Sequence, residues 1–519
     1  MKKFIYIIIV SLTAFFSTSC NEEFLETKPT TKMSGDGMFS TGTAALVPLN
    51  GIYRMMYTQG WSTTGNTQQC DGLVAWNLMA DLMGEDMVMK AQGSGWYWFD
   101  CVYNVKSRYT SSAWRSYDVW NGFYTLISNA NYIIAAEETM TGDTKDVNYA
   151  IGQAYAIRAY CYHYLAMIFA RTYKGHEGDP CVPIYTEPSV AGTPGKPRST
   201  VGEVYELIRT DIDKAVELLK DAHTKKHCTH IDYYVANGIK ARICLTTNEW
   251  AEAANAAKIA RENFTIGRGT ELTGGMNNAT LPNVMWGAEI IETQTPGWGP
   301  FLYHIDALSM LPGTQTYAYS APKCISTLLY SKMGDNDIRR QWWNPNSTDI
   351  EGDPVRSNYL QLKFRFSNPV TALGDKIWMR VEEMYLTEAE ALCRQEQYSQ
   401  AQSVLNEYMQ TRDPNYSTGK TGNSLGALTT DETGSLLEEI LIQRRIELWG
   451  EYGRIYDIKR LKQGFTRTAA MGWPAAALIE GRDTQNPETY AWVLTIPQSE
   501  FDGNSSLDPN KDQNPVGDR

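Results

Sequence analysis

Two pairs of helix-periodic segments recur 148 residues apart, and they constrain the fold more than any other feature of this 519-residue chain. Residues 233–248 and 249–263 form one pair, and residues 375–395 and 398–411 form the other. The corresponding positions are Ala241 and Ala389, Trp250 and Tyr398, and Ala253 and Ala401. Small residues let paired helices approach and an aromatic ring fills the gap, as in tetratricopeptide repeats. The alternative is two unrelated helical hairpins.

Further helical segments make the predicted fold mainly α. Apolar residues recur at three and four positions in 114–136 and 148–171, which predicts two long helices. Two capping boxes, Thr200-x-x-Glu203 and Ser435-x-x-Glu438, predict helix starts, and the second helix should end near Gly450. Residues 175–197 are rich in Gly and Pro and should form a connection.

Two stretches show no sustained helical period. Residues 33–105 are loop-rich, with short helices expected at 44–57 and 73–82. Residues 267–375 are rich in Gly, Pro, Asn and aromatics. A structureless loop of that length is rare in a compact domain, so we expect an irregular subdomain packed on a helical scaffold.

The first twenty residues have the pattern of a bacterial secretion signal that ends in cysteine. Lys2 and Lys3 precede the apolar run 5–16, and small residues lead to Cys20. The run is too short to cross ~30 Å of hydrocarbon. We therefore predict cleavage after residue 19 and a lipid on Cys20; the alternative is an ordinary signal peptide cleaved nearby. Acidic residues after Cys20 resemble the surface-export signal of Bacteroidetes lipoproteins.

Composition narrows the function classes. The net charge of −12 argues against nucleic acid and against anionic membrane surfaces as partners. The cysteines show no C-x-x-C spacing, which argues against a zinc or redox site; a disulfide between Cys70 and Cys101 stays open. The 15 Trp and 31 Tyr exceed what a helical core needs and indicate exposed stacking surfaces.

Ordered motifs along the mature chain resemble the SusD/RagB family of outer-membrane nutrient-binding lipoproteins. The similarity rests on Trp120, Tyr124, Ile127 and Asn131; Ile151-Gly152-Gln153-Ala154 with Arg158-Ala159-Tyr160; Pro197-Arg198-Ser199-Thr200; Arg380, Glu383, Tyr385, Leu386, Ala389, Glu390 and Ala391; Arg445, Glu447, Leu448, Glu451, Arg454, Asp457 and Arg460; and Ile496-Pro497 with Glu500, Asn504 and Gln513-Asn514-Pro515. The chain departs from the family pattern at Gln153, where Glu is usual, and at Gly453, which follows Glu451 by two residues.

The resemblance implies one SusD-like domain over residues 20–519, after a signal at 1–19. Its scaffold would comprise roughly 110–265 and 375–465, and its ligand-binding parts roughly 33–105 and 267–375. It also implies a binding protein without enzymatic activity or cofactor, on the outer membrane, beside a SusC-like TonB-dependent transporter. The charged motif residues Arg380, Glu383, Arg445, Glu447, Arg454 and Asp457 lie among apolar neighbours, so we expect buried salt bridges rather than catalysis.

Sugars stack on exposed aromatic rings and hydrogen-bond through hydroxyls, so aromatics outside the helices are candidate ligand residues. Trp96 and Trp98 follow a Gly-rich run, in the region where the resembled family carries a stacking Trp. The alternative is a strand that buries alternate Trp side chains. The remaining candidates are Trp61, Trp298, Tyr303, Tyr317, Tyr319 and, as a hydroxyl partner, Asp81, for which an acidic cap or a solvated turn is the alternative.

Three functions remain after this reading: capture of glycans, capture of peptides as in the RagB branch, and glycoside hydrolysis. An acidic chain would favour basic peptides. A hydrolase needs two carboxylates roughly 5–10 Å apart, and Asp81 with Glu85 or Asp86 is the cluster available for that role. Residues 334–337 could offer oxygen ligands to Ca²⁺ but lack EF-hand spacing, so we expect a turn there.

Overall fold

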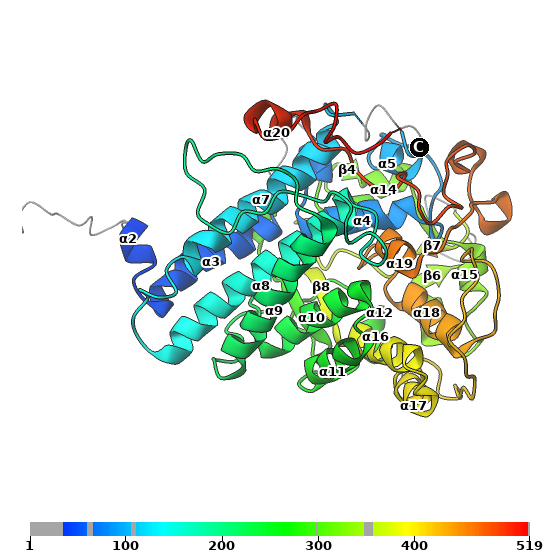
Figure 1. Ribbon diagram of the computed structural model, residues 1–519. Coiled ribbons are helices and arrows are strands. Elements are labelled where there is room, and N and C mark those ends of the chain that lie inside the picture. The colour runs from blue at the N-terminus through cyan, green and yellow to red at the C-terminus, as the bar shows by residue number, and fades with distance from the viewer. Residues whose placement is uncertain (1–34, 60–65, 105–109, 296–298, 347–356, 517–519) are drawn as a thin grey trace, which may run out of the picture.

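The structure, a computed structural model, describes residues 35–59, 66–104, 110–295, 299–346 and 357–516 (Figure 1). Its longer helices are α3 (Gly42–Met56), α4 (Leu73–Met83), α7 (Trp114–Ile134), α8 (Thr144–Phe169), α9 (Val201–Lys220), α10 (Tyr233–Thr247), α11 (Trp250–Arg261), α16 (Val381–Arg394), α17 (Tyr398–Met409), α18 (Leu436–Glu447) and α19 (Arg454–Leu461). Its short helices are α2 (Gly35–Met38), α5 (Trp98–Cys101), α12 (Thr270–Thr273), α13 (Phe301–Ile305), α14 (Tyr317–Ser320), α15 (Thr327–Tyr330) and α20 (Gln498–Gly503). Among the described residues the fold is mainly helical, as the sequence predicts.

The scaffold is a row of helices in which each packs on the next. α7 packs on α8, α8 on α9, α9 on α10, and α10 on α11. α11 then packs on α16, although more than a hundred residues separate them, and α16 contacts α17 and α18. The chain therefore leaves the row after α11 and returns to the same place (Figure 1). This arrangement confirms the tetratricopeptide-like interpretation of the two hairpins.

The repeated positions occupy equivalent environments in the two hairpins. Ala241, Ala389, Ala253 and Ala401 are fully buried between the helices. Trp250 and Tyr398 are half-buried against the core at the start of the second helix of each pair. The capping box of Thr200 and Glu203 forms in both directions, whereas Glu438 bonds to Thr433 and Gly434 and only the Ser435 half of the second box forms.

The segment between the hairpins contains short strands rather than a continuous loop. β1 (Met87–Met89), β5 (Lys323–Ile325), β7 (Leu360–Gln361) and β6 (Trp343–Asn344) form an antiparallel sheet in that order. β3 (Met310–Leu311) pairs with β4 (Thr314–Gln315). β2 (Val284–Ala288) pairs with β8 (Lys376–Arg380).

β8 corrects one sequence expectation. Residues 376–380 were predicted to belong to the helix of 375–395, but they form a strand, and α16 begins at Val381. Ile377, Trp378 and Met379 suit either state, and their backbone groups pair with β2, which lies about ninety residues earlier. A distant partner of this kind leaves no local signal.

Two further expectations concern termini and cysteines. Within the described ranges, no helix is both long and apolar enough to cross a membrane.

Cys101 is a buried free thiol whose Sγ lies 3.7 Å from Nη1 of Arg467. The disulfide to Cys70 that the sequence left open is therefore not formed. Cys20 lies outside the described residues.

Candidate ligand-binding site

The segment around Trp96 forms a tight turn rather than a strand. Gly93, Gly95 and Tyr97 have φ angles of +52°, +88° and +61°, so three of five consecutive residues adopt the left-handed conformation that turns the chain. A side chain on Gly93 would lie 2.7 Å from Oγ of Ser320, so this turn contacts α14 closely. The turn leaves Trp96 half-exposed and buries Trp98 in α5 with 8% of its surface accessible. Trp96 is thus the ring of this pair that a ligand can reach.

Trp96 contacts aromatic residues from the irregular segment, more than two hundred residues along the chain. The ring centroids of Trp96 and Tyr317 are 5.7 Å apart. Behind Tyr317 lie Tyr303 at 5.9 Å and His304, stacked at 5.1 Å. Tyr317 and Tyr319 on α14 are half-exposed, whereas Tyr303 on α13 is buried. The structure brings Trp96, Tyr303 and Tyr317 into one cluster, as a shared site requires.

His304 supports this cluster as a neutral ring. It is fully buried, and it packs edge-on against Tyr97, whose ring centroid is 4.9 Å away. Burial lowers the pKa of His304 to about 3, and nearby Lys323 acts in the same direction. The cluster therefore carries no histidine charge at neutral pH, which suits an uncharged ligand. Trp61 and Trp298 lie outside the described residues.

Asp81 lies in the interior, away from solvent. Its Oδ1 accepts a hydrogen bond from the backbone N–H of Arg454 at 2.7 Å, and the residue is 4% exposed. Burial raises the pKa of Asp81 to about 8. This position does not support a hydrogen bond to a ligand hydroxyl, and burial excludes a solvated turn. The alternative of an acidic cap agrees with the contact, because Arg454 is the first residue of α19.

Glu85 and Asp86 are buried in ion pairs. Arg454 and Arg445 lie 2.9 and 3.1 Å from Oε1 of Glu85, and Arg445 lies 2.6 Å from Oδ1 of Asp86. Burial opposes ionisation of Glu85, but Arg454 and Arg445 lower its pKa to about 2. A general acid in a glycoside hydrolase needs a raised pKa and access to substrate. Glu85 has neither property.

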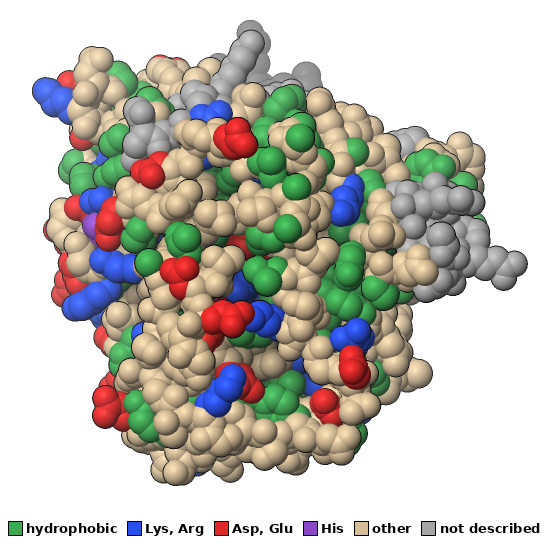
Figure 2. Space-filling view, turned by 90° about the vertical axis from the view of Figure 1, so that its right-hand side faces the viewer, with side chains coloured by type: hydrophobic (Ala, Val, Ile, Leu, Met, Phe, Trp, Pro, Cys, Tyr) green, Lys and Arg blue, Asp and Glu red, His purple; other side chains and the backbone are tan. Residues whose placement is uncertain are grey.

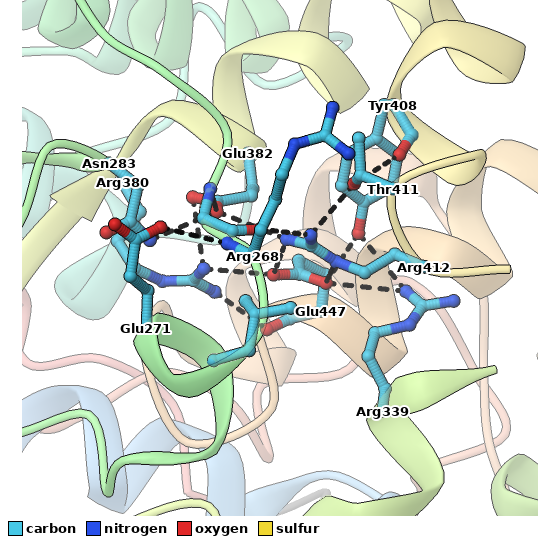
Figure 3. A network of polar contacts seen from close by, with 12 residues as sticks. Arg268, Glu271, Asn283, Arg339, Arg380, Glu382, Tyr408, Thr411, Arg412 and Glu447 are labelled. Atoms are coloured by element: carbon cyan, nitrogen blue, oxygen red, sulfur yellow. Dashed lines mark hydrogen bonds and ion pairs between the residues drawn. The ribbon is translucent and has the colours of Figure 1, made fainter. Parts of the chain in front are cut away.

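Two of the charged motif residues, Arg380 and Glu447, lie in a buried network, as predicted (Figure 3). Glu447 lies 2.9 Å from Arg380 and 3.1 Å from Arg412, and Tyr408 donates its hydroxyl to the same carboxylate. Burial alone would raise the pKa of Glu447, but Arg412, Arg380 and Arg339 hold it well below its usual value. The network ties β8, α17 and α18 together, so its role is structural.

The neighbouring pairs have the same character, and Gln153 fits its position. Arg242 pairs with Glu383 at 2.6 Å, and Asp457 pairs with Arg444 and Arg460 at 2.9 and 2.7 Å. Oε1 of Gln153 accepts hydrogen bonds from the hydroxyl of Tyr53 and the backbone N–H of Ile231, and its amide donates to Tyr149. A neutral amide therefore satisfies this buried site without a salt bridge.

Residues 334–337 form the expected turn. Asp337 caps the following 3₁₀ helix, Ile338–Trp342, and pairs with Arg339 at 2.7 Å. The side chain of Asp335 is 98% exposed. The carboxylate of Asp337 is thus already engaged in contacts within the protein, as expected for a turn rather than a Ca²⁺ site.

One groove was missed by the sequence analysis. It has a volume of about 440 Å³ and is lined by Tyr117, Trp120, Tyr124, Tyr185, Glu500 and Asn504, among others. Trp120 and Tyr124 lie on one stripe of α7, a pattern that indicates core, and Trp120 is indeed 5% exposed. Tyr117 and Tyr185 are half-exposed and supply the accessible rings. Tyr185 comes from the Pro-rich connection, so no local signal joins it to α7.

Charge is mixed on one face of the molecule. On the face shown in Figure 2, which is the right-hand side of Figure 1, acidic and basic side chains lie interspersed among hydrophobic ones. A face of this kind does not produce a strong field of one sign.

Comparisons with known proteins agree with this architecture. Residues 74–245 match a sequence model described as "Starch-binding associating with outer membrane", and residues 305–516 match the SusD family. SusD-like protein P2 of Formosa agariphila is 23% identical over 423 residues, which cover 75% of this chain and 79% of that protein.

Solved structures share the fold. A SusD-like carbohydrate-binding protein from Bacteroides vulgatus superposes with a TM-score of 0.72 at 23% identity, over 92% of this chain and 99% of that one. Surface glycan-binding protein A from Bacteroides thetaiotaomicron, in complex with laminarihexaose, superposes with a TM-score of 0.66 at 15% identity, over 91% and 99%. With the ordered motifs, the row of helices and both family matches in agreement, this chain belongs to the SusD/RagB family.

Proposed function

We propose that this chain is a surface lipoprotein that binds oligosaccharide or polysaccharide without catalysing a reaction, and that it passes the glycan to a TonB-dependent transporter. The observation that carries the proposal is the pair of accessible rings, Trp96 and Tyr317, held 5.7 Å apart by two distant segments. An aromatic pair of this kind offers an apolar platform for the C–H face of a sugar. Half-exposed Tyr319 extends the platform along α14.

Three considerations support glycan binding over peptide binding and glycoside hydrolysis. The cluster is neutral, since His304 is uncharged above pH ~4. The carboxylates available to a hydrolase, Asp81, Glu85 and Asp86, are buried and bonded within the protein. A protein of the same fold was solved with a glucan oligosaccharide, laminarihexaose. The lipid on Cys20, the outward orientation and the transporter partner remain parts of the proposal that rest on the sequence.

The test is calorimetric titration of the purified protein against a panel of glycans that includes laminarihexaose, and in parallel against peptide mixtures. We expect binding to at least one glycan and none to peptides. Failure to bind any glycan, in a protein whose circular dichroism shows the folded helices, would contradict the proposal. Binding of peptides that glycans do not compete away would favour the RagB-like alternative.

Two variants locate the site. Trp96→Ala should weaken glycan binding, whereas Tyr185→Ala, in the groove beside α7, should leave it unchanged. The opposite result would move the site to that groove. Association with a transporter is tested by affinity purification of the tagged chain from detergent-solubilised outer membranes. A TonB-dependent barrel should co-purify.

A further inference from the structure

Three metal-ligating side chains from two distant segments lie close together, and none of them belongs to the aromatic cluster. His227 and Cys228 belong to the connection between α9 and α10, and Glu289 follows β2. One ligand atom from each of the three side chains lies within 4.8 Å of the others. In the sequence, the absence of C-x-x-C spacing argued against a zinc site, but a site assembled from two distant segments has no such spacing.

We propose that His227, Cys228 and Glu289 form a binding site for a borderline transition-metal ion such as Zn²⁺. Thiolate, imidazole and carboxylate together are a donor set typical of zinc. The proposal is independent of glycan binding, because none of these residues belongs to the aromatic cluster.

The sulfur and nitrogen positions fit one tetrahedral ion. Sγ of Cys228 lies 3.7 Å from Nδ1 of His227. Bonds of about 2.3 Å to sulfur and about 2.0 Å to nitrogen, at a tetrahedral angle, would place the two atoms about 3.6 Å apart. The two donors thus already have the separation that shared coordination requires. Glu289 is exposed, so its flexible side chain can close the remaining distance.

Nδ1 of His227 is the ring nitrogen that faces Cys228. The backbone N–H of Thr229 donates to this atom at 3.2 Å, and Oγ1 of Thr229 lies 2.9 Å from it, so its lone pair is directed at polar neighbours. A metal ion would take over that lone pair in place of the hydrogen bond.

Backbone contacts hold the two segments in place. Gly287 donates its N–H to the carbonyl of Cys228 at 3.2 Å, and Nε1 of Trp286 donates to the carbonyl of Thr229 at 2.7 Å. After Glu289, the N–H of Ile290 donates to Asp375 at 2.8 Å. These contacts fix the positions from which Cys228 and Glu289 extend, which lowers the ordering needed for binding.

Two lysines and a cavity lie next to the three side chains. Lys226 donates to the carboxylate of Asp146, which offsets its charge, whereas Lys225 donates its ammonium to the uncharged carbonyl of Met285 and still acts on Cys228. His227 and Cys228 also line a cavity of about 450 Å³. Three protein ligands next to a cavity leave space for a water molecule or a small ligand in the fourth position.

The test uses Co²⁺ as a spectroscopic substitute for Zn²⁺. We expect the purified protein to show thiolate-to-cobalt charge transfer in the near ultraviolet and tetrahedral d–d bands in the visible, both removed by added Zn²⁺. Cys228→Ser should abolish the charge-transfer band, and His227→Gln should weaken Co²⁺ binding by roughly tenfold or more. Glu289→Gln should also weaken binding, whereas Glu292→Gln, a matched exposed glutamate on the same segment, should not.

A second measurement uses the unmodified protein, so its result does not depend on whether a variant folds. Among the cysteines of the described residues, Cys228 is the partly exposed one and the others are buried. Zn²⁺ should therefore protect the Cys228 peptide from alkylation by iodoacetamide, as identified by mass spectrometry. Co²⁺ binding without a charge-transfer band, or alkylation of Cys228 at the same rate with and without Zn²⁺, would overturn the proposal.

Discussion

The ring of Trp96 lies 5.7 Å from the ring of Tyr317, with their planes inclined at 59°. The first residue precedes a four-residue helix, and the second begins another helix more than two hundred residues later. Neither ring is shielded completely, and buried Tyr303 and His304 support Tyr317 from behind. This contact joins the two loop-rich parts of the chain into one surface and defines the platform to which we assign glycan binding.

Glu447 is the residue on which the buried ion network depends most. Glu447→Gln keeps the shape of the side chain but removes one of the two carboxylate charges that Arg380 and Arg412 share, the other being Glu382. Removing one partner of a buried pair costs about 3–5 kcal/mol in the free energy of unfolding. Urea denaturation should show a loss of that size. Glu432→Gln, which breaks the surface pair with Lys332, is the control and should leave the midpoint unchanged; equal effects would contradict a structural role for the network.

Gly453 should resist substitution because of its backbone conformation. Its φ is +102°, and a Cβ would lie 2.8 Å from Cβ of Ala80. Gly453→Ala should therefore destabilise the protein by about 1–3 kcal/mol. Gly51, within α3, has open space around its Cβ position, so Gly51→Ala should stabilise by about 0.5–1 kcal/mol. Thermal unfolding distinguishes the two, and a neutral Gly453→Ala would show that this turn is relaxed.

Asp81 makes stability depend on pH. Burial raises its pKa to about 8 in the folded protein, whereas the unfolded chain has the ordinary value near 4. Between these values the folded state holds one proton more, so this group destabilises the protein progressively as pH rises from about 4 to about 8.

Asp81→Asn should remove that dependence. Relative to wild type, the variant should gain at least about 1 kcal/mol in the free energy of unfolding between pH 5 and pH 9. Denaturation at both pH values measures the difference, with Asp335→Asn at an exposed position as control. A constant difference between Asp81→Asn and wild type would show that Asp81 ionises normally.

Cys20 is the predicted lipid acceptor. Cys20→Ala should abolish incorporation of radiolabelled palmitate and shift the protein from the outer-membrane fraction to the soluble fraction. Cys228→Ala, which removes a cysteine far from the signal, should leave labelling intact. Labelling that persists in Cys20→Ala would contradict the assignment.

Local patterns predicted most of the scaffold. The predicted capping box at Thr200 and the predicted hairpin positions Ala241 and Ala389 are confirmed. Helix periodicity and helix caps depend on residues only three or four positions apart, so the local sequence is enough to predict them. β8 was missed because β2, its partner, lies far away in sequence.

The sequence predicts only part of the arrangement of the candidate residues, because that arrangement depends on contacts between distant segments. The sequence identifies the segment of Trp96 but does not distinguish half-exposed Trp96 from buried Trp98, since the turn depends on positive φ angles at Gly93, Gly95 and Tyr97. Asp81, Glu85 and Asp86 resembled a polar loop, yet they are buried against Arg445 and Arg454 from the other end of the chain. Long-range ion pairing of this kind cannot be read from a single segment.

The most direct test of the account is the affinity of Trp96→Ala for the glycan that binds wild type most tightly, measured by titration calorimetry. Loss of one stacking ring should reduce affinity about tenfold, equivalent to about 1.4 kcal/mol. Tyr132→Ala, which removes an exposed ring on α7 that does not belong to the cluster, should bind as wild type does. An unchanged affinity in Trp96→Ala, with the fold intact, would contradict the assignment of the Trp96–Tyr317 surface as the glycan site.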